Sequence, residues 1–372
     1  MLYLDNSATT QILPEVRSAM LPYLMEEYGN PSSKYYLVAE NAKNAVKEAR
    51  NSISSLLGCT EREIIFTSGS TESNNMIIKG VADYYSKNGN HIITTKVEHP
   101  SVLETCKFLE TKGFEVTYLN VDNFGRVDLS ELSSSITDET ILVSIIWGNN
   151  ELGSLNDMKA ISEICLEREV FLHTDATQVV SKVGIDLIEF PGIKFLSCSA
   201  HKFHGPKGIG AAFIRKDRYD ILAKITPLMH GGGQEEGYRS GTSAVHNIVG
   251  MGKAGEMAQT NLSNNIKKLC VLEGYLTTIL NGKFKDMLIF NHDNEHKIPG
   301  ILSVQFKGIN NEILVKKLAP FIAASTGSAC SSSKPSHVLD AIGLSIDQVR
   351  NTIRFSLSPT IENEDLNIFN EL

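Results

Sequence analysis

Two charged side chains each follow a strand-like run in the middle of the chain. Asp175 comes directly after the run at residues 170–174, and Lys202 follows the run at residues 194–197. Where strands are parallel, residues just past their carboxyl ends meet at one edge of the sheet. Pyridoxal phosphate chemistry requires a lysine that forms a Schiff base and a carboxylate that keeps a proton on the pyridine nitrogen. Taken singly, a surface lysine and a helix N-cap are the more common roles of two such residues.

A glycine between hydroxyl-bearing residues links the run at 64–66 to a helix-like segment. Ser68, Gly69, Ser70 and Thr71 stand at this junction. Gly69 lets the backbone approach a ligand closely, and the two following hydroxyls join the free N–H groups at a helix start in a site for phosphate. The same residues also fit an ordinary serine-capped helix, which is the more common meaning of so short a motif.

The elements that must position these residues alternate along the chain. Runs of strand length, rich in β-branched or aromatic residues, occupy residues 63–67, 91–95, 115–119, 141–146, 170–173 and 194–197. Helical spacing of apolar residues predicts helices at 39–57, 76–86, 102–111 and 158–167. This alternation predicts βαβ units in a mostly parallel sheet, with the chemistry beyond the strand ends.

Composition excludes several classes of protein. The 372 residues carry 35 Lys and Arg against 43 Asp and Glu, and no basic run occurs, so direct nucleic-acid binding is not expected. No apolar stretch approaches the ~18 residues of a membrane span, and the start lacks a secretory signal. The six cysteines form no CxxC pair, which argues against a disulfide scaffold or a zinc site. We expect a cytoplasmic enzyme with reduced thiols, no metal and no membrane partner.

Further motifs join those around Asp175 and Lys202, in one order from residue 3 to about 358. They are YLDNSATT at 3–10, GNPSS at 29–33, FTSGSTESN at 66–74, EH at 98–99, NNELG at 149–153, DATQ at 175–178, HK at 201–202, GPKGIG at 205–210, HGGGQ at 230–234, RSGT at 239–242, GSAC at 327–330 and RFSL at 354–357. With them the sequence strongly resembles the cysteine desulfurases, pyridoxal-phosphate-dependent enzymes of the class V aminotransferase-like group. The resemblance is to members that supply sulfur for iron–sulfur clusters, nitrogenase and nucleic-acid thiolation.

The resemblance implies a role for each matching residue. Lys202 would form the Schiff base, Asp175 would pair with the pyridine nitrogen, and His99 would stack on the ring. Gln178 would hydrogen-bond the phenolic oxygen of the cofactor. The cofactor phosphate would be held by Ser70, Thr71, Ser199, His201 and, from a neighbouring subunit, Thr242. Sharing of this kind implies a homodimer.

The substrate would be L-cysteine, held by its carboxylate. The resemblance gives this role to Arg354, whose planar fork matches two oxygens at once, and to Asn150, which would also contact the cofactor. His99 would add proton transfer to its stacking, although without the family a capping or core histidine is an equal alternative. His204 and His230 receive no role. The remaining histidines considered are interpreted as structural or surface residues: His91, His173, His246 and His337.

Cys330 selects the chemistry within the family. A thiolate must attack the sulfur of the bound cysteine, leaving alanine and a persulfide on the enzyme. The neighbours of Cys330, residues 325–329 and 331–333, are small and hydroxyl-rich, which predicts an exposed flexible loop. Free cysteines are usually inert core residues, and this interpretation fits the other five better: Cys59, Cys106, Cys165, Cys198 and Cys270.

The pattern departs from the family at a few places. Tyr36 and Ala39 stand where a histidine and a glycine are usual, and Ser358 stands where glycine is common. The segment after Cys330 is shorter than is typical, and the chain reaches Leu372 without the long C-terminal segment that many members use to meet sulfur acceptors. These departures favour a dedicated acceptor protein over a housekeeping one. Iron–sulfur assembly, tRNA thiolation and DNA phosphorothioation all stay open.

The sequence therefore predicts the type I fold of pyridoxal phosphate enzymes. A large α/β domain is expected over residues 13–251, and a small domain over residues 1–12 together with 252–372. Within the superfamily, the alternatives are a selenocysteine lyase or another class V aminotransferase-like enzyme. Outside it, the alternative is a non-catalytic sulfur-carrier scaffold, which the intact Lys202, Asp175 and His99 oppose.

Overall fold

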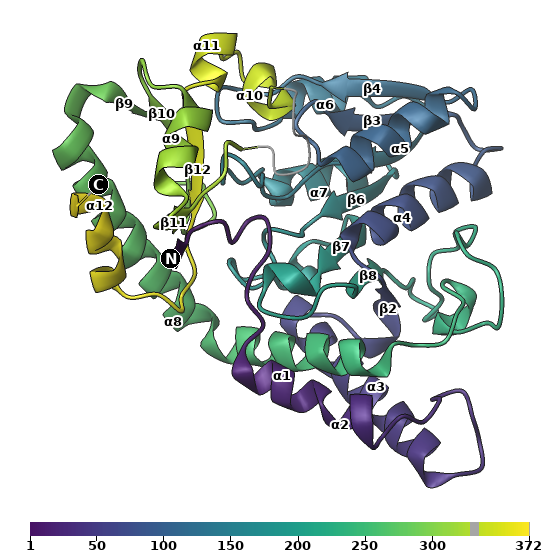
Figure 1. Ribbon diagram of the computed structural model, residues 1–372. Coiled ribbons are helices and arrows are strands. Elements are labelled where there is room, and N and C mark those ends of the chain that lie inside the picture. Colours follow the sequence, from purple (N-terminus) through teal and green to yellow (C-terminus); the bar gives the residue numbers. More distant parts are fainter. Residues whose placement is uncertain (328–334, 372) are drawn as a thin grey trace.

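A seven-stranded sheet forms the larger part of the molecule (Figure 1). The computed structural model describes residues 1–327 and 335–371. The strands lie in the order β2-β8-β7-β6-β5-β3-β4. Six of these seven strands run in the same direction, and β8 runs in the opposite direction. Their bounds are β2 Ile64–Thr67, β3 His91–Thr95, β4 Glu115–Leu119, β5 Thr140–Ser144, β6 Phe171–Asp175, β7 Ile193–Ser199 and β8 Gly210–Ile214.

Helices cover both faces of this sheet. Successive strand residues point to opposite faces, so Leu142 packs on one side and Val143 on the other. The first face is covered by α4 (Ser70–Tyr84) and α5 (Pro100–Glu110). The second face is covered by α1 (Pro14–Met20), α3 (Leu37–Leu57), α6 (Leu129–Ser135), α7 (Met158–Glu167) and the first half of α8 (Val245–Phe284). The short α2 (Pro22–Met25) follows α1.

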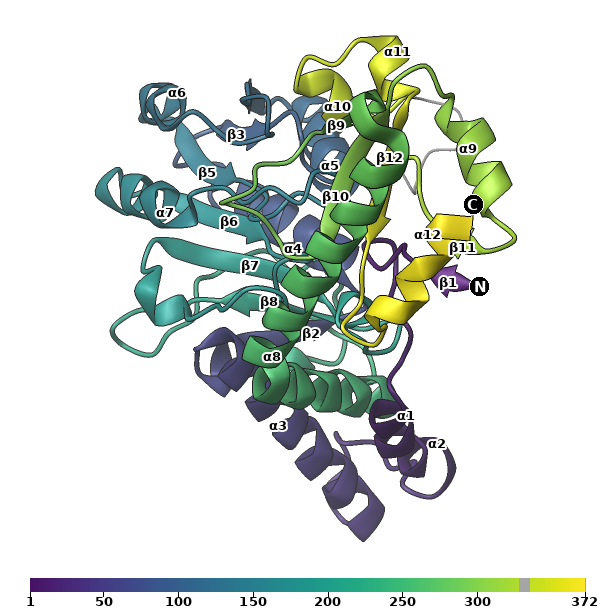
Figure 2. The ribbon, with the colours of Figure 1, turned by 90° about the vertical axis from the view of Figure 1, so that its left-hand side faces the viewer.

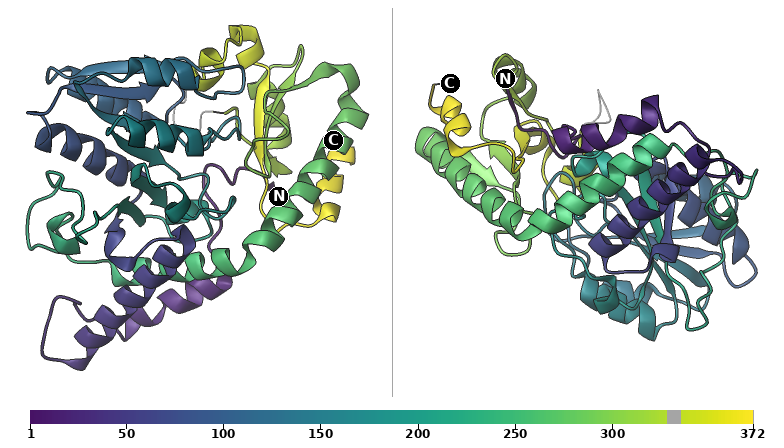
Figure 3. Two further views of the ribbon diagram at one scale, coloured as in Figure 1. Left: turned by 180° about the vertical axis from the view of Figure 1, so that it is seen from behind. Right: turned by 90° about the horizontal axis from the view of Figure 1, so that it is seen from below.

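Helix α8 connects the sheet to a second region. Its 40 residues begin beside α3 and run on to the strands β10 (Ile301–Phe306) and β12 (Thr352–Ser356), as Figures 2 and 3 show. The two halves of the helix belong to different hydrophobic cores. In its second half Leu269, Leu272, Leu276 and Leu280 are buried in the second of these cores. The predicted domain boundary at residues 251 and 252 falls inside this helix. The proposed division into domains therefore stays a prediction.

The second region joins both ends of the chain. Strand β1 (Leu2–Tyr3) pairs with β11 (Ile322–Ala323), and Asp5 forms a bridge with Ser356. The other strands form the sheet β12-β10-β9, with bounds Thr352–Ser356, Ile301–Phe306 and Leu288–Phe290. Its helices are α9 Asn311–Leu318, α10 His337–Ala341, α11 Ile346–Val349 and α12 Ile368–Glu371. The N-terminal segment thus runs between the two regions.

The predicted α/β architecture is confirmed, with two differences. Strand β8 was not predicted, because its Gly210, Ala211 and Ala212 lack the β-branched or aromatic side chains typical of strands. Helix α4 begins at Ser70 rather than near residue 76, because its first turn is polar and the apolar periodicity starts only at Met76. Among the described residues, none of the helices combines the length and apolarity needed to cross a bilayer.

Candidate active site

A cavity of about 280 Å³ opens at the edge of the large sheet, beyond the ends of β2, β3, β5, β6 and β7. Segments that follow all five strands contribute to its wall, as expected for the carboxyl ends of parallel strands. It brings together most of the predicted residues: Ser70, Thr71, His99, Asn150, Asp175, Gln178, His201, Lys202 and Arg354. The structure therefore assembles in one place residues that lie far apart in the sequence.

Lys202 reaches the cavity from a single 3-10 turn, Ala200–Lys202, which directly follows β7. Its Nζ donates hydrogen bonds of 2.7 Å to the backbone oxygens of Ser7 and Ala8, in the N-terminal segment. The Ser7 oxygen also accepts a 2.8 Å hydrogen bond from Gln178 Nε2. The N-terminal segment thus holds the lysine and the glutamine against the same backbone position.

Asp175, at the end of β6, is buried and held as a hydrogen-bond acceptor. Its Oδ1 accepts from the backbone N–H of Thr177 at 3.0 Å, and its Oδ2 accepts from Asn74 Nδ2 at 2.8 Å. Both are hydrogen bonds to a carboxylate, which are stronger than bonds between neutral groups. The carboxylate is therefore fixed in orientation at the cavity wall.

His99 is connected to Asp175 through two side chains. Asn74 Nδ2 also donates to Ser101 Oγ at 2.8 Å, and Ser101 Oγ lies 2.8 Å from His99 Nδ1. Because the Ser101 backbone N–H donates to the same Nδ1, that nitrogen is the acceptor, and the neutral ring carries its proton on Nε2. Burial lowers the pKa of His99, and Lys202 and His337 lower it further. His99 is thus the N-cap of α5, and it lines the cavity as a ring that carries its proton on Nε2.

The phosphate end of the predicted site lies at the start of α4. Ser70 and Thr71 form its first turn, after Gly69 with φ 153°. Ser199 lies beside this turn, since a Cβ on Gly69 would come within 3.5 Å of Ser199 Oγ. Burial lowers the pKa of His201 to about 4, with Lys202 adding to the shift, so this ring is neutral at pH 7. A helix start with two hydroxyls suits an anion.

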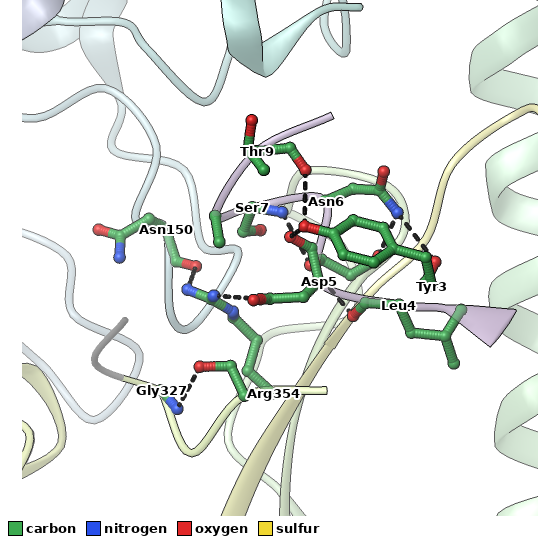
Figure 4. A network of polar contacts seen from close by, with 12 residues as sticks. Tyr3, Leu4, Asp5, Asn6, Ser7, Thr9, Asn150, Gly327 and Arg354 are labelled. Carbon is green, nitrogen blue, oxygen red and sulfur yellow. Dashed lines mark hydrogen bonds and ion pairs between the residues drawn. The ribbon is translucent and has the colours of Figure 1, made fainter. Parts of the chain in front are cut away.

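Arg354, on β12, forms the opposite wall (Figure 4). One terminal nitrogen donates to Asp5 Oδ1 at 2.7 Å, and the other donates to the backbone oxygen of Asn150 at 2.9 Å. Its Nε is buried and has no hydrogen-bond partner in the described part of the chain. The guanidinium is therefore oriented by two partners and keeps donors for a ligand.

Two predicted residues that the structure describes, Ser199 and Thr242, do not line this cavity. Thr242 is exposed and lines a separate small cavity with Ser68 and Arg239. Cys330 lies outside the described residues, so its role stays a prediction. Cys270 is exposed, which corrects its interpretation as a core residue, whereas Cys106, Cys165 and Cys198 are buried, and burial raises the pKa of each to about 12.

Sequence reasoning missed several residues of the site. His337, interpreted from the sequence as a structural or surface residue, lines the cavity and donates from Nε2 to the Glu98 backbone oxygen at 2.9 Å. Helix α10 places it there because Val338 and Leu339 pack with Val97 and Leu152. Nothing in the local sequence signals this packing. Asn74 and Ser101, by contrast, fall inside or next to recognised motifs.

The cavity fits pyridoxal phosphate on the chemistry of its donors. An anion site at the start of α4, a carboxylate at Asp175 and an amine at Lys202 match the phosphate, the ring nitrogen and the aldehyde of that cofactor. Within residues 1–327 and 335–371, Thr177 Oγ1 and Arg354 Nε are buried polar atoms without partners. Such atoms usually mark a place where a ligand or water completes the hydrogen bonding.

Comparisons with known proteins agree with this geometry. Residues 2–369 match the family described as aminotransferase class-V. The cysteine desulfurase IscS of Dictyoglomus turgidum is 44% identical over 369 residues, 98% of this chain and 92% of the relative. A NifS-like protein of known structure covers 100% of this chain and 97% of its own, with a TM-score of 0.92 and 38% identity. SspA in complex with cysteine covers 96% and 99%, with a TM-score of 0.85 and 37% identity.

Proposed function

Because the chain belongs to the class-V aminotransferase family, and within it to the pyridoxal-phosphate-dependent cysteine desulfurases, we propose that it converts L-cysteine to L-alanine and carries the sulfur as a persulfide on Cys330. The observation that carries this proposal is the cavity in which Lys202 and His99 face Arg354. The amine, the proton donor and the carboxylate-binding group of an amino-acid enzyme are then all present.

The residues of the sheet edge would hold the cofactor and move protons. Bound pyridoxal phosphate supplies an electron sink for negative charge at the substrate's α-carbon. Lys202 would hold the cofactor covalently, Ser70, Thr71, Ser199 and His201 would bind its phosphate, and Asp175 would keep its ring nitrogen protonated. His99 carries its proton on Nε2, and transfer of this proton to the substrate would be balanced by uptake of a proton at Nδ1, so that the ring stays neutral.

The opposite wall would bind the substrate. Arg354 lines the cavity, where its guanidinium would bind the substrate carboxylate, and Asp5 and the backbone oxygen of Asn150 hold its terminal nitrogens. Paired hydrogen bonds from arginine to a carboxylate fix direction as well as charge. The SspA structure with cysteine supports this amino acid as the substrate class.

The sulfur step balances without a further reagent. The Cys330 thiolate attacks the sulfur of bound L-cysteine, the sulfur–Cβ bond breaks, and its electron pair stays with the carbon, which takes up a proton. Enzyme thiol and L-cysteine thus become enzyme persulfide and L-alanine. Because this thiol must stay reduced, a reducing compartment such as the cytoplasm suits the reaction.

We further propose that the enzyme works as a homodimer, with Thr242 completing the phosphate site of the neighbouring subunit. Two observations support this. Thr242 is exposed and outside the cavity of its own chain. Large apolar side chains are also exposed close together in the sequence, at Leu24, Met25, Tyr28, Tyr35 and Leu37, and such surfaces typically mark contacts with another protein. The final sulfur acceptor would be a protein of iron–sulfur assembly or nucleic-acid thiolation.

The test is a stoichiometry. Purified protein reconstituted with pyridoxal phosphate should release L-alanine and, with a thiol reductant, sulfide in equal amounts from L-cysteine. Lys202→Ala should form neither product. Alanine or pyruvate formation without sulfide would contradict the assignment and favour a plain aminotransferase-like enzyme.

A further inference from the structure

A second lysine lies behind the cavity, four residues after Gln178. Lys182 Nζ donates a 2.9 Å hydrogen bond to Gln178 Oε1, its one hydrogen-bond partner among the described residues. Lys182 also lines a neighbouring cavity of about 170 Å³, and Lys202 borders both cavities. Lys182 therefore contacts the amide oxygen of Gln178, a residue that lines the proposed cofactor site.

Two contacts fix which way the Gln178 amide points, one from Lys182 to its oxygen and one from its nitrogen to the Ser7 backbone oxygen. An ammonium group only donates, so the amide oxygen must face Lys182. The amide nitrogen then faces the other way, where one N–H donates to the Ser7 backbone oxygen at 2.8 Å. Gln178 is buried and lines the cavity, so the second N–H of the same nitrogen is presented there.

This orientation matters because the two ends of an amide have opposite chemistry. An N–H stabilises a negatively charged oxygen, whereas an amide oxygen in its place would repel it. The phenolic oxygen of pyridoxal phosphate carries negative charge. Without Lys182, only the bond to the Ser7 backbone oxygen would hold the amide, and its oxygen would lose its donor.

We propose that Lys182 is a positioning residue, which fixes the Gln178 amide so that it donates a hydrogen bond to the phenolic oxygen of the cofactor. The inference rests on the proposed contact of Gln178 with the cofactor. Burial, together with the nearby charges of Lys202 and Arg354, lowers the pKa of Lys182 to about 7, as expected for a cation placed close to an active site. Lys182 acts only through its neighbour and touches no reacting atom.

The experiment follows the visible absorbance of the reconstituted enzyme as a function of pH. Negative charge on the phenolic oxygen is fullest in the high-pH form, so loss of a donor moves the midpoint to higher pH. Lys182→Met should raise the midpoint by roughly 0.5–1 pH unit, the equivalent of one hydrogen bond. Lys182→Arg, which is also donor-only, should restore it. Lys182→Gln should also raise the midpoint, because its side-chain oxygen can accept from a rotated Gln178. This variant replaces Lys182→Met in the experiment if Lys182→Met is unstable.

A double-mutant cycle separates orientation from charge. Removing a cation by itself also raises the midpoint, and this effect would persist in any background. If Lys182 acts through Gln178, Lys182→Met should shift nothing further in a Gln178→Ala enzyme. Equal shifts in both backgrounds, or no shift in the single variant, would overturn the inference. An unshifted midpoint in Gln178→Ala would overturn the contact between Gln178 and the cofactor, and the role of Lys182 with it.

Discussion

The two walls of the active-site cavity are built in different ways. On the sheet side, the segments that follow β2, β3 and β6 contribute Asn74, His99, Ser101 and Asp175, which form one continuous chain of side-chain hydrogen bonds. On the opposite side, Arg354 is oriented by partners 204 and 349 residues away in the sequence. One wall follows from the sheet itself. The other exists only when both ends of the chain have met.

The difference matches the two proposed roles, in which the sheet side binds the cofactor and the Arg354 side binds the substrate. A cofactor that stays in place needs fixed acceptors and donors, which the strand ends supply. A substrate that enters and leaves needs spare hydrogen-bond donors, which the guanidinium of Arg354 would supply at the cavity. Variants on the two walls should therefore separate cofactor chemistry from substrate affinity.

Arg354→Lys should have the largest effect of these variants. It keeps the charge but removes the planar fork, and loss of one hydrogen bond to a charged group costs about 1.5–3 kcal/mol. KM for L-cysteine should rise by about 10- to 100-fold, with the cofactor absorbance unchanged. Steady-state kinetics and a spectrum check both parts. An unchanged KM would contradict the proposal that Arg354 binds the substrate carboxylate.

Asp5→Asn tests the same wall from behind. Asp5 is positioned by the N-terminal segment, whose Tyr3 hydroxyl lies 3.1 Å from the Asp5 backbone oxygen and 3.0 Å from that of Thr9 (Figure 4). Weakening its ion pair with Arg354 should raise KM by about fivefold to tenfold and leave kcat nearly unchanged. A fall in kcat without a change in KM would show that Asp5 acts on the chemistry and not on substrate binding.

Ser101→Ala tests the sheet wall. The Ser101 hydroxyl stabilises the neutral form of His99, so its loss should raise the pKa of His99 and move the acidic limb of the kcat profile to higher pH. Loss of about 1 kcal/mol should lower kcat about fivefold with KM unchanged. Ser101→Thr keeps the hydroxyl and serves as the control. Identical pH profiles for the alanine variant and the wild type would refute the connection.

A buried histidine on β6, His173, should make the stability of the folded protein sensitive to acid. His173 is buried between Ser144 and Ser197, and burial lowers its pKa to about 4. The folded state therefore binds this proton less readily than the unfolded state, where the pKa is about 6.5. The stabilisation is present above about pH 6.5 and is lost as pH falls toward 4. Urea titrations at several pH values measure the free energy of unfolding. Between about pH 6.5 and 4 this free energy should fall less steeply in His173→Asn than in the wild type. Equal dependence on pH in the two proteins would contradict the assignment.

Sequence reasoning succeeded where the signal was local. Strands β3 and β4 have the predicted bounds because their β-branched runs end in turns, and residues that follow strand ends were expected to converge. His337 and Lys182 show where it stopped. The place of His337 depends on α10 packing across the cavity, and that of Lys182 on the turn after β6 that brings it to Gln178. The His337 contact leaves no pattern in the residues around it, whereas the spacing of four residues between Gln178 and Lys182 was there to be read.

The central claim is that sulfur from L-cysteine passes to Cys330. Reconstituted enzyme given one equivalent of L-cysteine without reductant should be digested and examined by mass spectrometry. The peptide that contains Cys330 should gain the mass of one sulfur atom, with one alanine released per sulfur bound, and Cys330→Ala should gain none while it keeps the cofactor absorbance. Sulfur found on Cys270, or full alanine turnover by Cys330→Ala, would contradict the account.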